Sequence, residues 1–108
     1  MEVPDIIKKD VEKKGGLEGI INLLAVEDKI IQKSKIHHAL SDPLRMKILN
    51  LLIIQPLCVC LIKEAIDMPD SKLSYHLSVL KECGLIEGKR RRNWIIYHAT
   101  KLGKEYKV

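Results

Sequence analysis

The chain has 108 residues, 46% of them hydrophobic, which is enough for one domain with a core and too little for two independent cores. No apolar run reaches the roughly 20 residues of a membrane-spanning helix, and the N-terminus lacks the apolar centre of a signal peptide. Three cysteines do not make a disulfide framework. We therefore expect a cytoplasmic protein that does not engage a membrane. The formal net charge is +5, and the whole excess lies in residues 87–108, because residues 1–86 carry equal numbers of basic and acidic side chains.

The first 34 residues predict helices ahead of the main domain. Asp5 suits the N-cap of a short helix that ends at Gly15-Gly16, where a left-handed backbone is easily adopted. A second helix is expected from Leu17, because apolar residues recur at helical spacing as far as Ile31. This stripe packs either on its own domain or against a second subunit. We favour the second subunit, and interpret 1–34 as a helical dimerisation segment ahead of a domain at 35–108.

Ser41-Asp42-Pro43 marks the start of the next helix, because aspartate is a good N-cap and proline is tolerated at the first helical position. The face expected to turn inward consists of Leu44, Ile48, Leu51 and Leu52. Arg45 and Lys47 then point outward, and Gln55-Pro56 ends the helix. A shorter helix follows, with its inward residues expected to be Val59, Ile62 and Ile66.

A further helix is predicted from Ser71 to Glu82, with Gly84 stopping it. Its core face consists of Leu73, Leu77 and Leu80. Short hydrogen-bonding side chains occupy the remaining surface: Ser71, Ser74, Tyr75 and Ser78, with His76 at the margin between the two faces. Because serine weakens a helix relative to glutamate or lysine, this composition favours a surface that contacts base edges and phosphates.

Two segments rich in strand formers, beginning at Leu85-Ile86 and at Trp94, predict a hairpin whose loop spans Gly88 to Asn93. This loop carries the basic run Lys89, Arg90, Arg91 and Arg92. An isolated basic run is usually a solvated loop, but here it accompanies a helix of small polar side chains. Three helices followed by a basic hairpin are typical of a winged helix-turn-helix, mainly α with a small β-hairpin, so we interpret the run as a phosphate contact on DNA.

Between Ile36 and Tyr97 the sequence resembles the ArsR/SmtB family of winged-helix transcriptional repressors. The resemblance is carried by His38–Arg45, Leu57–Cys60, Ser74–Ile86 and Tyr97. It implies a homodimer that binds two half-sites of double-stranded operator DNA, and repression that is relieved by a metal or metalloid ion. The resemblance implies DNA contacts at Ser71, Ser74, Tyr75 and His76, and on the wing at Lys89, Arg90, Arg91 and Arg92. We add Lys72 and Ser78, which lie on the same helix, as candidate contacts.

Cys58 and Cys60 resemble the thiolate site of the arsenic- and cadmium-responsive members of that family. Thiols at a helix start ionise more readily, and thiolates bind soft ions, so the candidate inducers are As(III), Sb(III), Cd(II) and Zn(II), none of them required for folding. Positions two apart in a regular helix point about 200° from each other. Chelation therefore requires an irregular helix start, and otherwise both cysteines are small residues at the core edge.

The chain departs from the family pattern at several ligand positions. Leu61 replaces an acidic residue, Lys63 stands where one arsenic-type arrangement has its third cysteine, and residues 1–57 contain no cysteine. Residues 99–108 contain neither aspartate nor histidine, so the family's second metal site, on a C-terminal helix, is absent. Trigonal As(III) prefers three sulfurs, whereas only two lie together in this sequence.

The remaining thiol and imidazole groups are expected to be structural. Cys83 precedes a glycine and is expected to be packed, whereas His37 and His38 can complete a tetrahedral site but are expected to be surface groups. Three alternatives stay open: Cys58 and Cys60 form a redox switch, the repressor has no inducer site, or the winged helix is a protein-interaction module. No motif typical of an enzyme is present, and we expect none of the corresponding activities.

Overall fold

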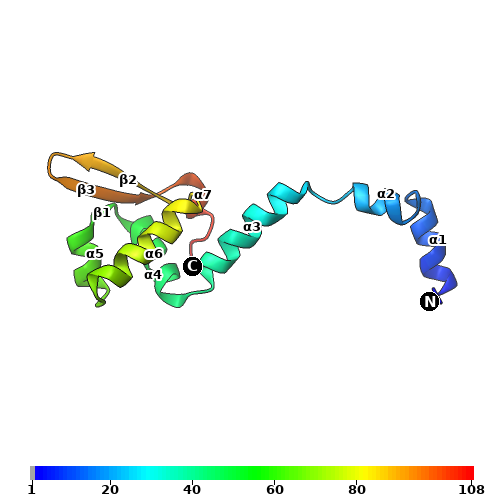
Figure 1. Cartoon of the computed structure of the whole chain (residues 1–108), viewed down its shortest axis with the longest axis horizontal. Helices are drawn as coiled ribbons and strands as arrows, with labels where there is room; N and C mark the ends of the chain where they lie inside the picture. Colours follow the sequence, from blue (N-terminus) through cyan, green and yellow to red (C-terminus); the bar gives the residue numbers. More distant parts are fainter. Residues whose placement is uncertain (1) are drawn as a thin grey trace. The chain divides into compact units, whose positions relative to one another are not determined.

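The computed structural model describes residues 2–108 and divides into two compact units, 2–31 and 32–108, with the division inside one helix. The elements in chain order are α1 Asp5–Lys13, α2 Gly16–Asn22, α3 Glu27–Leu40, α4 Pro43–Ile54, β1 Leu57–Cys58, α5 Val59–Ala65, α6 Asp70–Glu82, β2 Ile86–Arg91, β3 Trp94–Ala99 and α7 Lys101–Lys104 (Figure 1). None of the helices in residues 2–108 has the length and apolar character that crossing a bilayer needs.

The N-terminal unit differs from the predicted helices in two respects. Gly15 and Gly16 do separate α1 from α2, with φ of 89° and 77°. The N-cap of α1, however, is Pro4 and not Asp5, because the fixed φ of proline already suits the entry to the helix and Asp5 is its first residue. The prediction of one long helix from Leu17 to about Ile31 was also wrong. The chain leaves the helical conformation after α2, and the acidic Glu27 and Asp28 begin a new helix, where negative charge is favourable.

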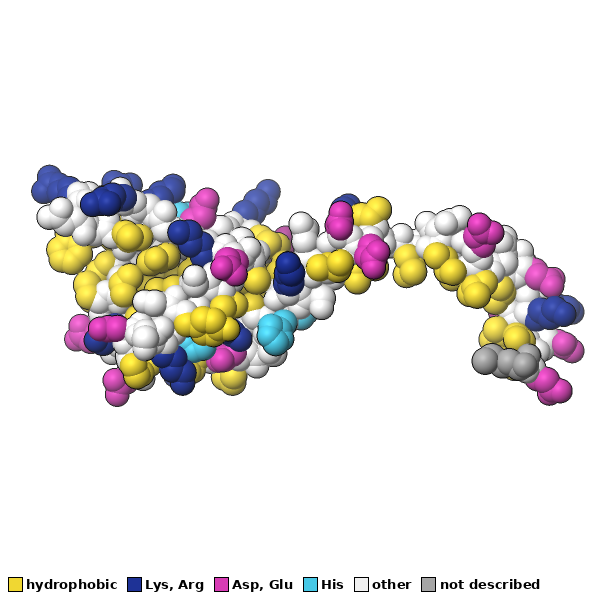
Figure 2. Space-filling model, in the orientation of Figure 1, with side chains coloured by type: hydrophobic (Ala, Val, Ile, Leu, Met, Phe, Trp, Pro, Cys, Tyr) yellow, Lys and Arg dark blue, Asp and Glu magenta, His cyan; other side chains and the backbone are white. Residues whose placement is uncertain are grey.

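The N-terminal unit has no buried side chain in α1 or α2. Large apolar residues are exposed along its length: Val3, Ile6, Ile7, Leu17, Ile21, Leu23, Leu24, Val26, Ile30 and Ile31. Figure 2 shows yellow apolar side chains exposed on this unit. This much apolar surface is left without a covering element inside the unit itself.

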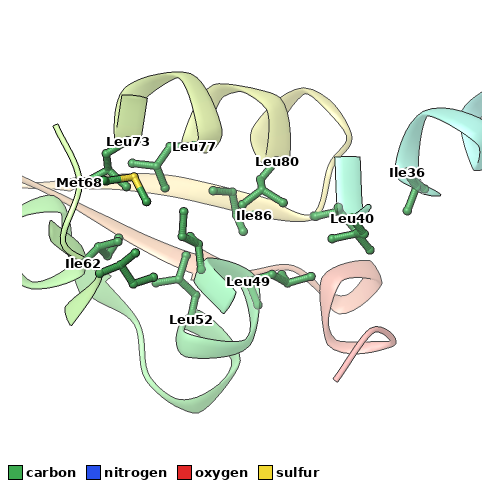
Figure 3. Close-up of a cluster of buried hydrophobic side chains, with 14 residues drawn as sticks. Ile36, Leu40, Leu49, Leu52, Ile62, Met68, Leu73, Leu77, Leu80 and Ile86 are labelled. Carbon is green, nitrogen blue, oxygen red and sulfur yellow. The ribbon is translucent and has the colours of Figure 1, made fainter. Parts of the chain in front are cut away.

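The core of residues 32–108 lies between α4, α5, α6 and the sheet (Figure 3). The predicted inward face of α6 is confirmed, since Leu73, Leu77 and Leu80 are all buried, as are Ile62 and Ile66 around α5. Leu49 is fully buried but was not predicted. Because α4 packs on α6, β3 and α7 together, its buried arc is wider than a single helical stripe.

Asp42 caps α4 as predicted, its carboxylate accepting hydrogen bonds from the backbone N–H groups of Leu44 and Arg45. The prediction that Arg45 points outward was wrong. Its side chain is buried, and its Nε donates to the carbonyl of Ala39 at 2.8 Å. Carbonyls in the last turn of a helix lack intrahelical partners, and Arg45 satisfies one of these at the end of α3.

The sheet has the order β1-β3-β2, with both pairings antiparallel. Arg91 pairs with Trp94, so the hairpin turn is only Arg92-Asn93, and Arg92 adopts a left-handed φ of 57°. The predicted loop from Gly88 was therefore too long, because strand pairing extends β2 through most of the basic run. The two-residue strand β1 was not predicted, and it fixes Cys58 opposite Ile96.

Candidate DNA-binding surface and thiol pair

The exposed face of α6 carries five of the six DNA contacts predicted on this helix. The buried leucines of α6 hold this face outward, and its exposed residues are Ser71, Lys72, Ser74, Tyr75 and Ser78. Their hydroxyl and ammonium groups can donate to base edges or phosphates. Tyr75 is 61% exposed, and the guanidinium of Arg45 lies 6.0 Å from its ring centroid.

His76 is separated from the other predicted contacts on α6. Its side chain is 3% exposed, and neither Nδ1 nor Nε2 has a hydrogen-bond partner. Burial lowers the pKa of His76, because the cation loses its hydration, with nearby Arg45 and Lys72 acting in the same direction and Asp42 against them. The sequence placed His76 at the margin of the helix. The structure instead places it in the interior of the domain.

The wing displays the basic run without acidic partners. Lys89, Arg90, Arg91 and Arg92 are all exposed, and none of them joins the ion pairs found in residues 2–108. Figure 2 shows dark blue basic side chains along the hairpin. Cations without an internal partner remain available for phosphates.

Cys58 and Cys60 are brought together by the irregular start of α5. Cys58 is the N-cap, with an extended backbone (φ −77°, ψ 162°), and its Sγ lies 2.9 Å from the Sγ of Cys60. Either sulfur can be the donor of this hydrogen bond. Its main effect is to lower the pKa of Cys58, and backbone N–H groups such as that of Leu61 add to the effect. The same hydrogen bond raises the pKa of Cys60. The two thiols therefore differ in acidity, and Cys58 is the more acidic of the pair.

A hollow of about 420 Å³ opens beside the two thiols. It is lined by Cys58, Val59, Cys60, Lys63, Asp70, Asn93, Trp94 and Ile95. Val59 was predicted to face the core, but it is 37% exposed and lines this hollow at the first position of α5. Trp94 and Ile95 were not predicted as site residues, since only the pairing of β1 with β3 brings them near the cysteines.

No third ligand joins the two sulfurs within the described chain: residues 2–108 contain no group of three His, Cys, Asp or Glu side chains placed to hold a metal. Cys83 is half-buried, as predicted, and its Sγ donates to the carbonyl of Lys35 at 3.7 Å. Burial raises the pKa of the Cys83 thiol. His37 and His38 are exposed in the last turn of α3, also as predicted.

The comparisons with known proteins agree with this architecture. Residues 42–88 match the sequence profile described as bacterial regulatory protein, arsR family. The chain is 32% identical over 72 residues to an HTH-type transcriptional regulator of Methanocaldococcus jannaschii, covering 66% of this chain and 81% of the relative. It is 37% identical over 62 residues to the arsenical resistance operon repressor of Escherichia coli, covering 56% of this chain and 53%, about half, of that repressor.

The fold is also similar to a solved structure. A homodimeric winged helix-turn-helix DNA-binding domain from Mycobacterium bovis, described as a possible ArsR-family transcriptional regulator, superposes with a TM-score of 0.65 at 25% identity. The match covers 76% of this chain and 78% of that domain. The relatives named above are regulators and not enzymes, in line with the sequence interpretation.

Proposed function

This chain belongs to the arsR family of bacterial regulatory proteins and is a transcriptional regulator. We propose that it represses transcription as a homodimer bound to operator DNA. We further propose that it is released from the operator when a soft metal or metalloid ion binds Cys58 and Cys60. The observation that carries the DNA-binding part is the exposed polar face of α6 in the same domain as an unpaired basic wing. The face of α6 contacts base edges, and the wing neutralises phosphates.

The homodimer follows from the N-terminal unit and from symmetry. A single winged helix has a small footprint, whereas two related by a two-fold axis contact half-sites about 34–36 Å apart. The apolar residues exposed on α1 and α2 offer a surface for the second subunit, and the similar domain of Mycobacterium bovis is homodimeric. The segment predicted at 1–34 therefore remains our proposed dimerisation segment, although its first residue lies outside the described part.

The inducer part rests on the two converging sulfurs. Thiolates prefer soft ions, so As(III), Sb(III), Cd(II) and Zn(II) are the candidates, and the repressor of Escherichia coli that this chain resembles belongs to an arsenical resistance operon. To act as an inducer, the ion must bind the DNA-free conformation more tightly. Operator DNA must then weaken ion binding by the same factor, with a typical coupling of about 1–3 kcal/mol.

The DNA-binding proposal is tested by selecting an operator from randomised duplexes and comparing its affinity with that of random DNA. Replacing Ser74 or Tyr75 by alanine is expected to reduce this discrimination while leaving the dependence on salt largely intact, because these side chains contact bases. Ser71→Ala is the companion variant at the start of the helix. Unchanged discrimination in all three variants would place sequence recognition elsewhere.

A redox switch is the second candidate, favoured by the same short Sγ–Sγ distance between two free thiols. A peroxide would oxidise the pair to a disulfide, taking two electrons and two protons and leaving water. Operator release by peroxide that is reversed by a dithiol reductant supports this candidate. Release by As(III) under reducing conditions supports the ion instead.

A further inference from the structure

We propose that Arg45 is a positioning residue for operator recognition: its buried guanidinium holds the ring of Tyr75 in the orientation in which that side chain contacts bases. This inference rests on the proposed function, because it concerns how one of the proposed base contacts is held in place. Arg45 acts on DNA only through Tyr75.

The two side chains come from different helices and differ in burial. Arg45 lies in the first turn of α4 and is 8% exposed, whereas Tyr75 lies on the outward face of α6 and is 61% exposed. The guanidinium carbon of Arg45 lies over the Tyr75 ring, 6.0 Å from its centroid. A cation at about this distance is attracted by the negative face of an aromatic ring. The contact therefore joins a cation of the interior to an exposed ring.

The guanidinium of Arg45 is itself held by groups outside α6. Its Nε donates to the carbonyl of Ala39 at 2.8 Å, and its Nη2 lies 4.0 Å from Oδ2 of Asp42. A buried arginine with these two partners has few rotamers available, and its planar group has a fixed direction. The end of α3 and the N-cap of α4 thus fix the cation, and the cation restricts where the Tyr75 ring lies.

His76 adds a second contact to Tyr75. The two rings have their centroids 5.9 Å apart and are inclined by 52°. Arg45 and His76 are the two buried polar side chains of residues 2–108, and both lie beside this one exposed tyrosine. An exposed side chain that exchanges between rotamers loses that freedom when it binds DNA. A ring already held in place avoids much of this loss.

The simpler explanation of Arg45 is its hydrogen bond to Ala39, which would make it a residue of the α3–α4 junction alone. That bond uses only Nε. The amide nitrogen of a glutamine is separated from Cα by as many bonds as Nε of arginine, so a glutamine at this position keeps a donor for the carbonyl. It lacks the cation that lies over Tyr75, and the two roles are therefore separable.

The test uses Arg45→Gln in the full chain. An operator selected with the wild type is changed one base pair at a time, and the loss of affinity at each change is measured at one salt concentration. The same series is repeated with Tyr75→Ala, with Arg45→Gln and with the double variant. Base pairs that matter to the wild type and no longer matter to Tyr75→Ala are the Tyr75-dependent positions.

Arg45→Gln is expected to reduce the penalty at the Tyr75-dependent base pairs by about 3- to 20-fold, the range that a cation–π contact supports. Penalties at the other base pairs should stay as in the wild type. In the Tyr75→Ala background, Arg45→Gln should cause no further loss, because no ring remains to be positioned. Wild-type penalties in Arg45→Gln, or an equal reduction at every base pair, would overturn the inference.

Ser41→Ala is the matched control. The Ser41 hydroxyl donates to the carbonyl of His38 at 2.7 Å, so this variant removes a side-chain hydrogen bond to the same end of α3 and keeps Arg45 and Tyr75. Its penalties should equal those of the wild type. A reduction at the Tyr75-dependent base pairs in Ser41→Ala as large as in Arg45→Gln would show a general effect of the junction and overturn the inference.

A measurement on the free wild type does not depend on the folding of any variant. Three-bond couplings measured by NMR should show that Tyr75 occupies one χ1 rotamer in the absence of DNA, as a positioned side chain does. Couplings averaged over several rotamers in the free wild type would contradict the proposed role of Arg45.

The result for Tyr75→Ala separates this inference from the proposed function. If Tyr75→Ala lowers penalties at some base pairs but Arg45→Gln does not, Tyr75 contacts bases and only the role of Arg45 is wrong. If Tyr75→Ala leaves every penalty unchanged, the proposed base contact of Tyr75 fails, and the role of Arg45 fails with it.

Discussion

At the scale of single residues, Arg45 and His76 are the two buried polar side chains of the described chain, and helical periodicity alone placed neither correctly. Helical periodicity gives the angle of each side chain around the helix axis. It does not show which neighbouring elements pack against that side chain. The end of α3 supplies a carbonyl for Arg45, and the packing around α6 covers His76 without providing a hydrogen bond.

Stability is expected to depend on the protonation of His76. Because burial lowers its pKa in the folded protein, the unfolded chain binds more protons once the pH falls below about 6.5. The contribution of the neutral imidazole is therefore present above that pH and is lost as the pH falls. Urea unfolding of the wild type and of His76→Leu at pH 7.5 and 5.5 measures this effect.

In His76→Leu, two buried nitrogens without partners are replaced by an apolar group. We expect unchanged or slightly higher stability at pH 7.5, by up to about 1 kcal/mol, and a smaller loss between the two pH values than in the wild type. An identical loss in both proteins would show that other groups cause the acid sensitivity.

Arg45 is expected to contribute to the junction of α3 and α4. Arg45→Met keeps much of the buried side chain but leaves the carbonyl of Ala39 without its donor, so unfolding free energy should fall by about 1–3 kcal/mol. Lys47→Ala, an exposed change on the same helix, should stay within about 0.5 kcal/mol. Similar effects of the two substitutions would argue against the Arg45–Ala39 hydrogen bond.

At the scale of elements, the helices with strong local signals were predicted well. Asp42-Pro43 and Gly84 mark the beginning of α4 and the end of α6, because caps and left-handed residues act within one turn of chain. The turn of the hairpin and the strand β1 were not predicted, since both depend on pairing with β3. The hollow beside the thiols depends on that same long-range pairing, which explains why the sequence identified Cys58 and Cys60 without Trp94.

The wing is expected to carry much of the salt dependence of DNA binding. If each wing places about two or three basic side chains on phosphates, Arg90→Ala, Arg91→Ala and Arg92→Ala together should reduce the slope of log affinity against log salt by roughly 0.9 for each phosphate that is no longer neutralised. The slope is measured by titrating the selected operator at several salt concentrations, and preference for that operator over random DNA should persist.

The same removal of three charges elsewhere is the control. The control uses three lysines from α7 and the C-terminal end: Lys101, Lys104 and Lys107. These residues follow the C-terminal end of β3, which is the end away from the hairpin turn. Their replacement by alanine should change the slope much less. Equal slopes for both triple variants would mean that overall charge and not the wing governs the salt dependence.

At the scale of the whole molecule, the N-terminal unit and residues 32–108 contribute different properties. The C-terminal unit has a continuous core, whereas α1 and α2 expose their apolar residues. The division predicted from the sequence, a helical segment at 1–34 ahead of a domain at 35–108, stays a prediction, and the two compact units meet at residues 31 and 32. The sequence did not predict the break between α2 and α3, because the apolar spacing continues across residues that are not helical.

Dimerisation should therefore depend on the N-terminal unit. Replacing Leu17, Ile21 and Leu24 together by serine is expected to raise the dimer dissociation constant about 100-fold or more, since each buried Leu or Ile contributes roughly 1.5 kcal/mol or more. Sedimentation equilibrium measures the constant. Ile54→Ser changes an exposed apolar residue of α4 and should leave it unchanged. A triple variant that dimerises like the wild type would exclude this segment as the interface.

The link between the thiol pair and DNA binding is tested most directly by operator affinity with and without a trivalent arsenical under reducing conditions. The measurement is made on the wild type and on Cys58→Ser with Cys60→Ser, a replacement suited to the N-cap at position 58. We predict that the arsenical weakens operator binding of the wild type by about 5–150-fold and leaves the double variant bound. Equal release of both proteins, or no release of the wild type, would contradict this account.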